Sequence, residues 1–357
     1  MTDPISPRQQ PRAARLSIPP PVLAELEEHG LPVGGVLDAV EDKLGEQVAS
    51  SNAFVDQVAR YLITAGGKRF RPLLVAMTGH LGSGTTDAAG EPASALVDAG
   101  VIVELVHLAT LYHDDVIDEA AARRGTPSAN SRWDNTVAIL TGDYLFACAS
   151  DLSADLGVEV TRIMARTLAS LCEGQISEVQ GSLGALPPDV PQLTPTRSHY
   201  LEVISGKTAS LIATSCRYGA LLSGVEPDGI EAAASYGWNV GMAFQLSDDI
   251  LDITSEADES GKTPGTDLRE GVRTLPVLFA LEDEPDGELA GLLAGEPSDA
   301  EVARALTLLR GSDALERSRR AAAEYVEVAM DQLVGFGDRP AVTALQRLAA
   351  YSLDRTG

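Results

Sequence analysis

The chain has 357 residues, of which 44% are hydrophobic and only 4% are aromatic, and its formal net charge is −25 at pH 7. Apolar residues in this proportion can form a large core, and a core poor in aromatic side chains must be built from Ala, Leu and Val, which favours helices. The strong negative charge excludes a protein that binds nucleic acid or an anionic membrane through a basic face.

The predicted organisation is a short leader followed by one helical domain. Residues 1–21 contain six prolines among polar residues, which predicts a disordered leader. Over residues 22–357 apolar residues recur at spacings of three and four, as in VLDAVEDKLGEQV and TRIMARTLASLCEGQISEVQ, and no run alternates as a strand would. We therefore predict a single all-α domain, a large helical bundle, although the length alone also allows two domains.

The helical pattern is interrupted where Gly, Pro or Asp are concentrated, at residues 82–92, 184–196, 224–229 and 284–299. These segments predict loops. The three cysteines (Cys148, Cys172 and Cys216) are scattered and have no C-x-x-C spacing, so they indicate neither a disulfide framework nor a zinc site. A reducing, cytoplasmic location is expected. No transmembrane segment is expected either, because the most apolar stretch, residues 96–113, contains two acidic residues and two histidines.

Lysine is scarce, and the chain contains only Lys43, Lys68, Lys207 and Lys262. Three of the four lie in short motifs: GGKRFRP (66–72), SGKTA (205–209) and ESGKTPGTDL (259–268). A role in solubility alone would scatter them. Because lysine ammonium groups hold phosphate oxygens as point charges, these motifs predict contacts with phosphate groups.

Three aspartates (Asp114, Asp115 and Asp118) end an apolar run, VIVELVHLATLYHDDVIDEA. On a helix Asp114 and Asp118 share one face, and Asp115 lies beside it. Carboxylates in an apolar setting require a positive partner, because burying an unpaired charge is costly. Arg123 and Arg124 follow in ARRGTP, where Gly and Pro are predicted to end a helix.

The same D-D-x-x-D pattern recurs in LSDDILDI, with Asp248, Asp249 and Asp252. Hard divalent cations such as Mg²⁺ prefer a few carboxylates completed by water and phosphate oxygens. One such motif could be a solvated helix face, but two copies in apolar surroundings favour a site for a metal-bound phosphate ester. The two motifs could mark an internal duplication or two facing helices, and both alternatives remain open.

Taken in order, the motifs resemble the trans-polyprenyl diphosphate synthase family, of the medium- or long-chain type. The resemblance rests on GGKRFRP, LVHLATLYHDDVIDEAAARRG, GDYL (142–145), SGKTA, GMAFQLSDDILDI, and GKTPGTDL followed by TLP (274–276). It implies the isoprenoid synthase type I fold, an all-α bundle with a central cavity, which is usually a homodimer. It also implies Mg²⁺ as the cofactor, with three ions per site.

The resemblance assigns roles residue by residue. Metal ions would be held on the diphosphate of an allylic substrate by Asp114, Asp115, Asp118, Asp248, Asp249 and Asp252. That diphosphate would also contact Arg123, Lys207, Thr208, Gln245 and Lys262. Isopentenyl diphosphate would bind to Gly67, Lys68, Arg71, His107 and Arg124. His107 precedes Asp114 by about two helical turns, so both would lie on one face.

The implied activity is that of a prenyltransferase that adds isopentenyl diphosphate head to tail to an allylic diphosphate. Ionisation of the allylic C–O bond would be assisted by metal ions and cations that stabilise the leaving diphosphate. Ala109 and Thr110 precede the first aspartate motif, and their small size predicts an open tunnel and a medium- or long-chain all-trans product. Tyr112 is bulky but is expected to point away from the tail. A geranylgeranyl or farnesyl diphosphate synthase is the alternative.

Two functions of another class are less favoured by these motifs. A terpene cyclase needs no isopentenyl diphosphate site, and Lys68, Arg71 and Arg124 argue against it. A non-catalytic synthase subunit usually lacks an aspartate cluster, and both are intact here. The chain departs from the family pattern in having Val272 where many members have Lys, a role that Arg273 could take over, and EGQISE (173–178) in place of E-G-E-x-x-Q. His113 is expected to serve polar packing.

Overall fold

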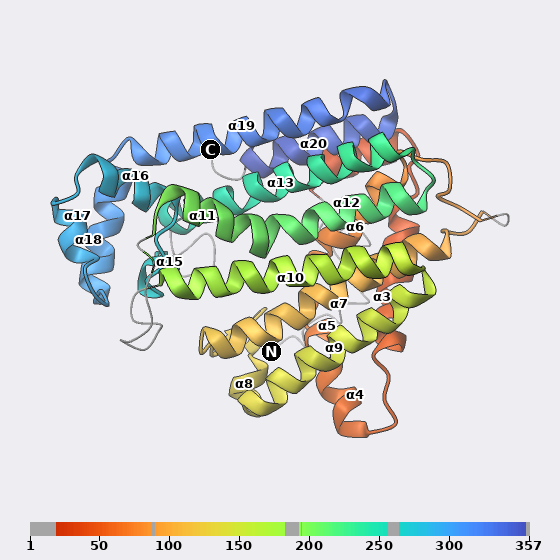
Figure 1. Cartoon of the computed structure of the whole chain (residues 1–357), viewed down its shortest axis with the longest axis horizontal. Coiled ribbons are helices and arrows are strands. Elements are labelled where there is room, and N and C mark those ends of the chain that lie inside the picture. The colour runs from red at the N-terminus through yellow and green to blue at the C-terminus, as the bar shows by residue number, and fades with distance from the viewer. Residues whose placement is uncertain (1–18, 88–89, 183–192, 194, 256–263, 355–357) are drawn as a thin grey trace, which may run out of the picture. The chain divides into compact units, whose positions relative to one another are not determined.

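The structure is a computed structural model that describes residues 19–87, 90–182, 193, 195–255 and 264–354 (Figure 1). In this part of the chain the regular structure is helical, apart from two strands of two residues each and one isolated bridge. The prediction of an all-α fold is therefore confirmed.

The chain forms two compact units. Unit 1 comprises the residues up to Arg166, Leu211–Gly237 and Leu333–Leu348, and unit 2 comprises Thr167–Ser210, Trp238–Gln332 and the residues from Ala349 onward. That residues 22–357 form one domain stays a prediction. Residues 1–18 of the predicted leader lie outside the described residues. Pro20 and Pro21 begin the first described helix, where proline is well accommodated because the first helical N–H groups have no partner.

The elements whose residues lie mostly in unit 1 are α2 (Pro20–Glu28), α3 (Val33–Gln47), α4 (Ala53–Ala59), α5 (Tyr61–Thr64), α6 (Phe70–Gly79), α7 (Ser94–Ile117), β1 (Ala122–Arg123), β2 (Thr126–Pro127), α8 (Ala129–Arg132), α9 (Asn135–Asp155), α12 (Ser210–Leu222) and the 3₁₀ helix η3 (Val334–Phe336). Three helices contribute residues to both units: α10 (Val158–Gly181), α13 (Pro227–Thr254) and α20 (Pro340–Asp354). Unit 2 adds α11 (Arg197–Ile204), the π-helix η2 (Ser205–Ala209), α15 (Thr266–Arg269), α16 (Leu275–Asp283), α17 (Glu288–Leu292), α18 (Asp299–Arg310) and α19 (Ala314–Gln332).

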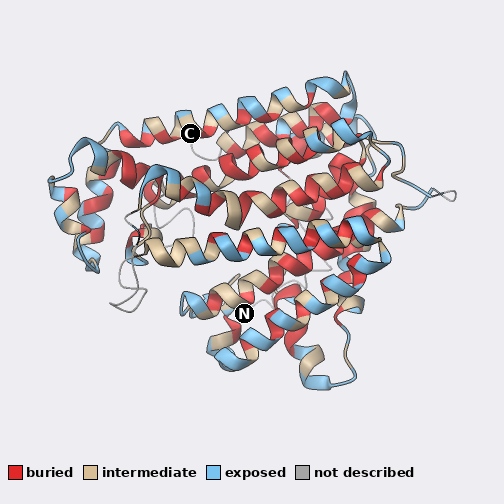
Figure 2. Ribbon diagram, viewed as in Figure 1, coloured by how far each residue is buried: buried red, intermediate tan, exposed pale blue. Residues whose placement is uncertain are grey.

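Helix α7 is the central helix of unit 1, where it packs against α3, α6 and α9. Most of it is buried (Figure 2), including Ile102, Leu105 and Leu108. Each aliphatic side chain of this size that is removed from water contributes about 1.5–3 kcal/mol to folding. This burial holds the aspartates at the end of α7 on a rigid element.

By length and composition alone, α7 and α9 could each cross a membrane. The most apolar window of α7 is 67% buried inside the protein. A core helix of a globular protein meets the same criterion, so length and composition are weak evidence for a membrane span.

The GDYL motif accounts for the close packing of α9 on α7. A Cβ added to Gly142 would lie 2.2 Å from Nε2 of His113, so only glycine leaves room for this imidazole. His113 Nε2 lies 3.0 Å from the Ile139 carbonyl oxygen, and the ring packs edge-on against Phe146. The contacts agree with the packing role expected for His113.

In unit 2, α16, α17 and α18 lie side by side (Figure 1). Leu289 on α17 and the adjacent Leu293 are buried in an apolar cluster with Val302 and Leu306 of α18. The segment 284–299 was predicted to be a loop, and in this respect the prediction is wrong, because it contains α17. The Gly and Pro residues on both sides hid a short helix that two buried leucines anchor.

Candidate active site

The first aspartate cluster lies at the end of α7. The helix ends at Ile117, and Asp118 caps it, since its backbone N–H donates to the Asp114 carbonyl at 2.8 Å. Asp114 is half-buried and Asp118 is exposed. Asp115 is completely buried, and its Oδ1 accepts a hydrogen bond of 2.6 Å from Arg123 Nε.

One carboxylate oxygen of this cluster has no partner among the residues that the structure describes. Asp115 Oδ2 is buried without a hydrogen bond. Burial raises the pKa of Asp115, and the neighbouring Arg123 lowers it by a smaller amount. A buried acceptor left in this way destabilises the fold unless a hydrogen-bond donor or a cation approaches it.

Arg123 and Arg124 belong to a tight hairpin that follows the helix. Ala122 pairs with Pro127 and Arg123 with Thr126, which leaves Arg124 and Gly125 as a two-residue turn. Both turn residues have positive φ, 53° and 75°, as this type of hairpin requires. The ARRGTP sequence was predicted to mark a helix end, and this is wrong, because α7 has already ended and ARRGTP forms the hairpin.

The residues predicted for isopentenyl diphosphate also lie in unit 1. Arg124 donates to the Leu62 carbonyl at 3.2 Å and to the Gly66 carbonyl. A Cβ on Gly67 would lie 2.8 Å from Arg124 Cζ, so glycine permits this approach. Lys68 is exposed just before α6.

Arg71 and His107 lie among the positive charges of neighbouring arginines. Arg71 Nε is buried and has no hydrogen-bond partner in the described part of the chain. Burial lowers the pKa of Arg71 to about 10, and the charge of Arg124 acts in the same direction. Burial, followed by the charges of Arg71 and Arg124, holds the pKa of His107 well below its usual range. His107 is therefore neutral near pH 7.

Arg69, in the same motif, was not predicted to have a separate role. Its side chain is only 4% exposed, and it forms ion pairs with Glu41 at 2.6 Å and Glu104 at 2.8 Å. Arg69 has a φ of 49° and precedes α6 directly. It ties the GGKRFRP segment to α3 and α7, and in this way it fixes the backbone next to Lys68 and Arg71.

The residues predicted to set product length differ in burial. Ala109 is completely buried, whereas Thr110 is half-buried, and its hydroxyl donates to the His107 carbonyl at 2.8 Å. The Tyr112 hydroxyl donates to the Val58 carbonyl at 2.6 Å. Tyr112 therefore points into the core at α4, and that it points away from the tail stays a prediction.

The second aspartate cluster, in unit 2, is held by a chain of hydrogen bonds. Asp249 is 3% exposed and accepts from the Tyr200 hydroxyl and from Gln245 Nε2, the latter at 2.9 Å. The Thr208 hydroxyl donates to Gln245 Oε1 at 2.9 Å. Burial raises the pKa of Asp249 to about 7, and the hydrogen bonds from Tyr200 and Gln245 oppose that shift. The predicted residues Thr208, Gln245 and Asp249 are thus brought together.

Asp252 of this cluster accepts backbone hydrogen bonds from the start of α15. The N–H groups of Thr266 and Asp267 donate to its two oxygens at 3.1 and 3.2 Å. Loss of hydration, followed by the charges of Asp249 and Asp252, raises the pKa of Asp267, and Glu178 adds to the shift. Asp267 and Glu178 are therefore further acidic members of the cluster.

Sequence reasoning missed Tyr200, Glu178 and Asp267. Asp267 lies within the quoted GKTPGTDL motif but was not singled out, and Tyr200 carries no local signal. Arg273 donates to the Leu293 carbonyl at 3.2 Å, and its role as a replacement for lysine stays a prediction. Lys262 lies outside the described residues.

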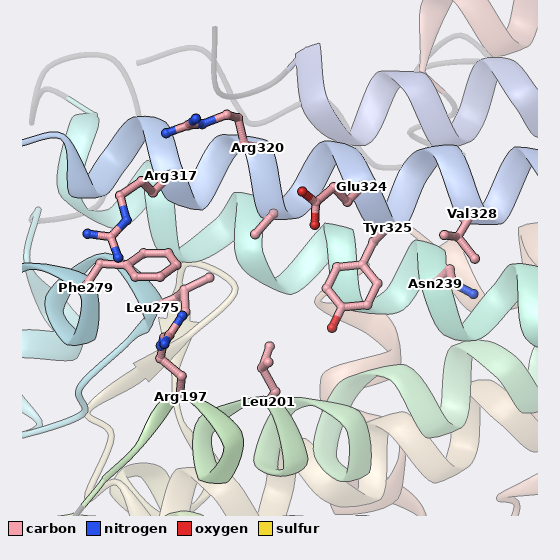
Figure 3. Close-up of a pocket in the computed structure, with 11 residues that line it drawn as sticks. Arg197, Leu201, Asn239, Leu275, Phe279, Arg317, Arg320, Glu324, Tyr325 and Val328 are labelled. Carbon is pink, nitrogen blue, oxygen red and sulfur yellow. The ribbon is translucent and has the colours of Figure 1, made fainter. Parts of the chain in front are cut away.

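A pocket of about 680 Å³ in unit 2 contains none of the predicted site residues. It lies between α11 and α19, and Figure 3 shows the Phe279 ring between the guanidinium groups of Arg197 and Arg317. These groups lie 5.3 and 4.1 Å from the ring centroid and pair with Glu282 and Asp283 respectively. Both arginines therefore already have acidic partners, and their contacts at this end of the pocket join α11, α16 and α19.

The donor set suits Mg²⁺. Among the described residues no three His, Cys, Asp or Glu side chains lie close enough to form a metal cage by themselves. Mg²⁺ usually retains several waters and binds through one or two carboxylates and substrate phosphates, so it needs no such cage. The unpartnered Asp115 Oδ2 is an acceptor of the required kind.

A sequence profile of the family described as polyprenyl synthetase matches residues 52–309. The chain belongs to this family. It is 45% identical to the nonaprenyl diphosphate synthase of Mycobacterium tuberculosis over 321 aligned residues. The aligned region covers 89% of this chain and 92% of that protein.

Solved structures agree with the family assignment. The decaprenyl diphosphate synthase from Rhodobacter capsulatus superposes with a TM-score of 0.81 at 33% identity, covering 94% of this chain and 99% of that chain. The geranylgeranyl pyrophosphate synthase from Corynebacterium glutamicum, complexed with calcium and isoprenyl diphosphate, has a TM-score of 0.76 at 37% identity and covers 95% and 98%. This polyprenyl synthetase family member is thus a prenyltransferase with the isoprenoid synthase fold, and it elongates prenyl chains.

Proposed function

We propose that this enzyme uses Mg²⁺ to add isopentenyl diphosphate to an allylic diphosphate and releases a medium- or long-chain all-trans polyprenyl diphosphate. The observation that carries the proposal is a complementary pair in unit 1. Among the described residues, Asp115 Oδ2 is a buried acceptor without a hydrogen-bond donor, and Arg71 Nε is a buried donor without an acceptor. A metal ion and a diphosphate together satisfy both.

In this proposal the cationic residues bind the diphosphates, and the aspartates bind the metal. Arg71, Arg124 and neutral His107 hold isopentenyl diphosphate and orient its double bond. Arg123 and Lys207 hold the allylic diphosphate, which leaves with the electrons of the C–O bond. The aspartates would hold Mg²⁺, which would supply Lewis-acid stabilisation of that leaving group. The double bond attacks the resulting cation, and loss of a proton gives a product one isoprene unit longer.

The direct test uses purified protein with Mg²⁺, isopentenyl diphosphate and a series of allylic primers, and the products are sized by chromatography. Consumption of isopentenyl diphosphate with a ladder of long products is expected. Farnesyl diphosphate as the sole end product would overturn the proposed chain length. Turnover of an allylic diphosphate without isopentenyl diphosphate would instead indicate a terpene cyclase.

We expect Thr110→Phe to shorten the product. Thr110 is half-buried, so a larger side chain there can extend into the tail path instead of overpacking the core, as it would at the fully buried Ala109. The same product assay gives the measurement, with Thr110→Ser as the matched control of wild-type product length. An unchanged product from Thr110→Phe would remove this residue from the tail path.

We further propose that the enzyme is a cytoplasmic homodimer. Ile139 and Leu140 on α9 are 43% and 61% exposed, and such apolar side chains favour contact with a second copy. Sedimentation analysis is expected to give twice the mass of the 37.4 kDa chain. Leu140→Glu is expected to shift the mass toward that of the monomer, and an unaltered dimer would place the interface elsewhere.

A further inference from the structure

Glu178 on α10 is the ion-pair partner of Lys207, and no role follows for it from the proposed mechanism. The Lys207 ammonium group lies 2.5 Å from Glu178 Oε2, which also accepts from Gln175 Nε2 at 3.1 Å. The side chains of Lys207 and Glu178 are 30% and 23% exposed. A ligand entering from solvent can therefore reach both.

The backbone fixes this pair. A Cβ on Gly174 would lie 2.6 Å from the Lys207 backbone N, and one on Gly206 would lie 2.8 Å from the Ser170 carbonyl oxygen. The π-helix and α10 are thus in direct backbone contact. Glu178 is one turn beyond Gly174 on the same face of α10, so it is directed toward the π-helix. The pairing is a consequence of how the two helices cross.

The pair also belongs to the second aspartate cluster. Thr208, the neighbour of Lys207, donates to Gln245, which in turn donates to Asp249. Glu178 acts electrostatically on Asp267 of the same cluster. The ammonium group that is assigned to the allylic diphosphate is therefore bound to a carboxylate before that substrate arrives.

We propose that Glu178 competes with the allylic diphosphate for the Lys207 ammonium group and so lowers the affinity of this subsite for its substrate. The proposal rests on the proposed function, since it assumes that Lys207 binds this diphosphate. An ammonium group donates at most three hydrogen bonds, so one that is given to Glu178 is not available to phosphate. Glu178 is a positioning residue. It does not contact the substrate, and it acts on substrate binding through Lys207.

The test measures binding of geranyl diphosphate by isothermal titration calorimetry, with Mg²⁺ and again with EDTA, in the absence of isopentenyl diphosphate. Glu178→Gln is expected to bind about fivefold more tightly than wild type, which is the effect of removing one half-exposed ion pair. Glu178→Asp retains the charge and is expected to bind as wild type does. Glu173→Gln, on the exposed side of the same helix, is the matched control and is expected to have no effect.

Lys207→Ala separates this proposal from the function on which it rests. It is expected to weaken binding, and adding Glu178→Gln to it is expected to change nothing more. If Lys207→Ala weakens binding but Glu178→Gln leaves the affinity unchanged or lower, the competition is refuted and the site assignment stands. If Lys207→Ala binds as wild type does, the assignment of Lys207 fails and the competition fails with it.

Steady-state kinetics give a readout that a purely structural role would not produce. In Glu178→Gln the KM for the allylic substrate is expected to fall, while the KM for isopentenyl diphosphate stays constant. Thermal melting shows whether the variant folds. A parallel change of both KM values would show a general disturbance of the site and would contradict the proposal.

Discussion

Asp114→Asn and Asp248→Asn are each expected to reduce kcat by roughly 10³-fold, the loss seen when a group that stabilises transition-state charge is removed. Both aspartates are half-buried, so the amide is accommodated and thermal melting is expected to change little. The measurement is the rate of isopentenyl diphosphate incorporation at saturating Mg²⁺.

Asp151→Asn provides the control, because Asp151 is an exposed acid on α9 outside both clusters. Wild-type activity is expected from it. Asp249→Asn is less informative, because Asp249 is buried and paired with Tyr200 and Gln245, and its replacement disturbs packing as well as metal binding. Near-normal rates in both Asp114→Asn and Asp248→Asn would refute the metal-binding role.

Arg69→Met is expected to lower the free energy of unfolding by about 3–5 kcal/mol, because it leaves the Glu104 carboxylate buried without its partner. Glu104 is 1% exposed, and Arg69 is held between it and Glu41. Denaturant titration measures the change. The double variant Arg69→Met, Glu104→Leu is expected to be more stable than Arg69→Met alone, since it removes the unpaired charge.

Arg304→Met is the matched control on the surface. Arg304 pairs with Glu288 at 2.7 Å, but the two side chains are 49% and 53% exposed. Exposed pairs of this kind contribute about 0–1 kcal/mol. Equal losses from Arg69→Met and Arg304→Met would show that burial does not determine the strength of the Arg69 pair.

The helical fold class and the aspartate and lysine motifs could be recognised from the sequence, because helical periodicity and short charged motifs each lie within a few neighbouring residues. Asp115 and Asp249 lie where the spacing predicts, on α7 and α13. Tyr200 could not be found in this way, since its contact with Asp249 depends on how α11 packs against α13. The hairpin around Arg124 was missed because its two positive φ values depend on the strands that flank it.

The charge balance around Lys207 was equally hidden. The departure of EGQISE from the family pattern was visible in the sequence, but its partner was not. Only the crossing at Gly174 and Gly206 shows that Glu178 meets Lys207. An ion pair between residues distant in the chain depends on how their helices pack. A single sequence motif therefore does not predict it.

The π-helix at SGKTA restricts how the length of this segment can change in evolution. A π-turn holds more residues than an α-turn. A one-residue deletion that restored a regular α-helix would rotate the residues before it by about 100° relative to α12. Lys207 would then leave the face that meets α10. Alignments of related chains are therefore expected to show no gap within this motif, while gaps accumulate in exposed loops.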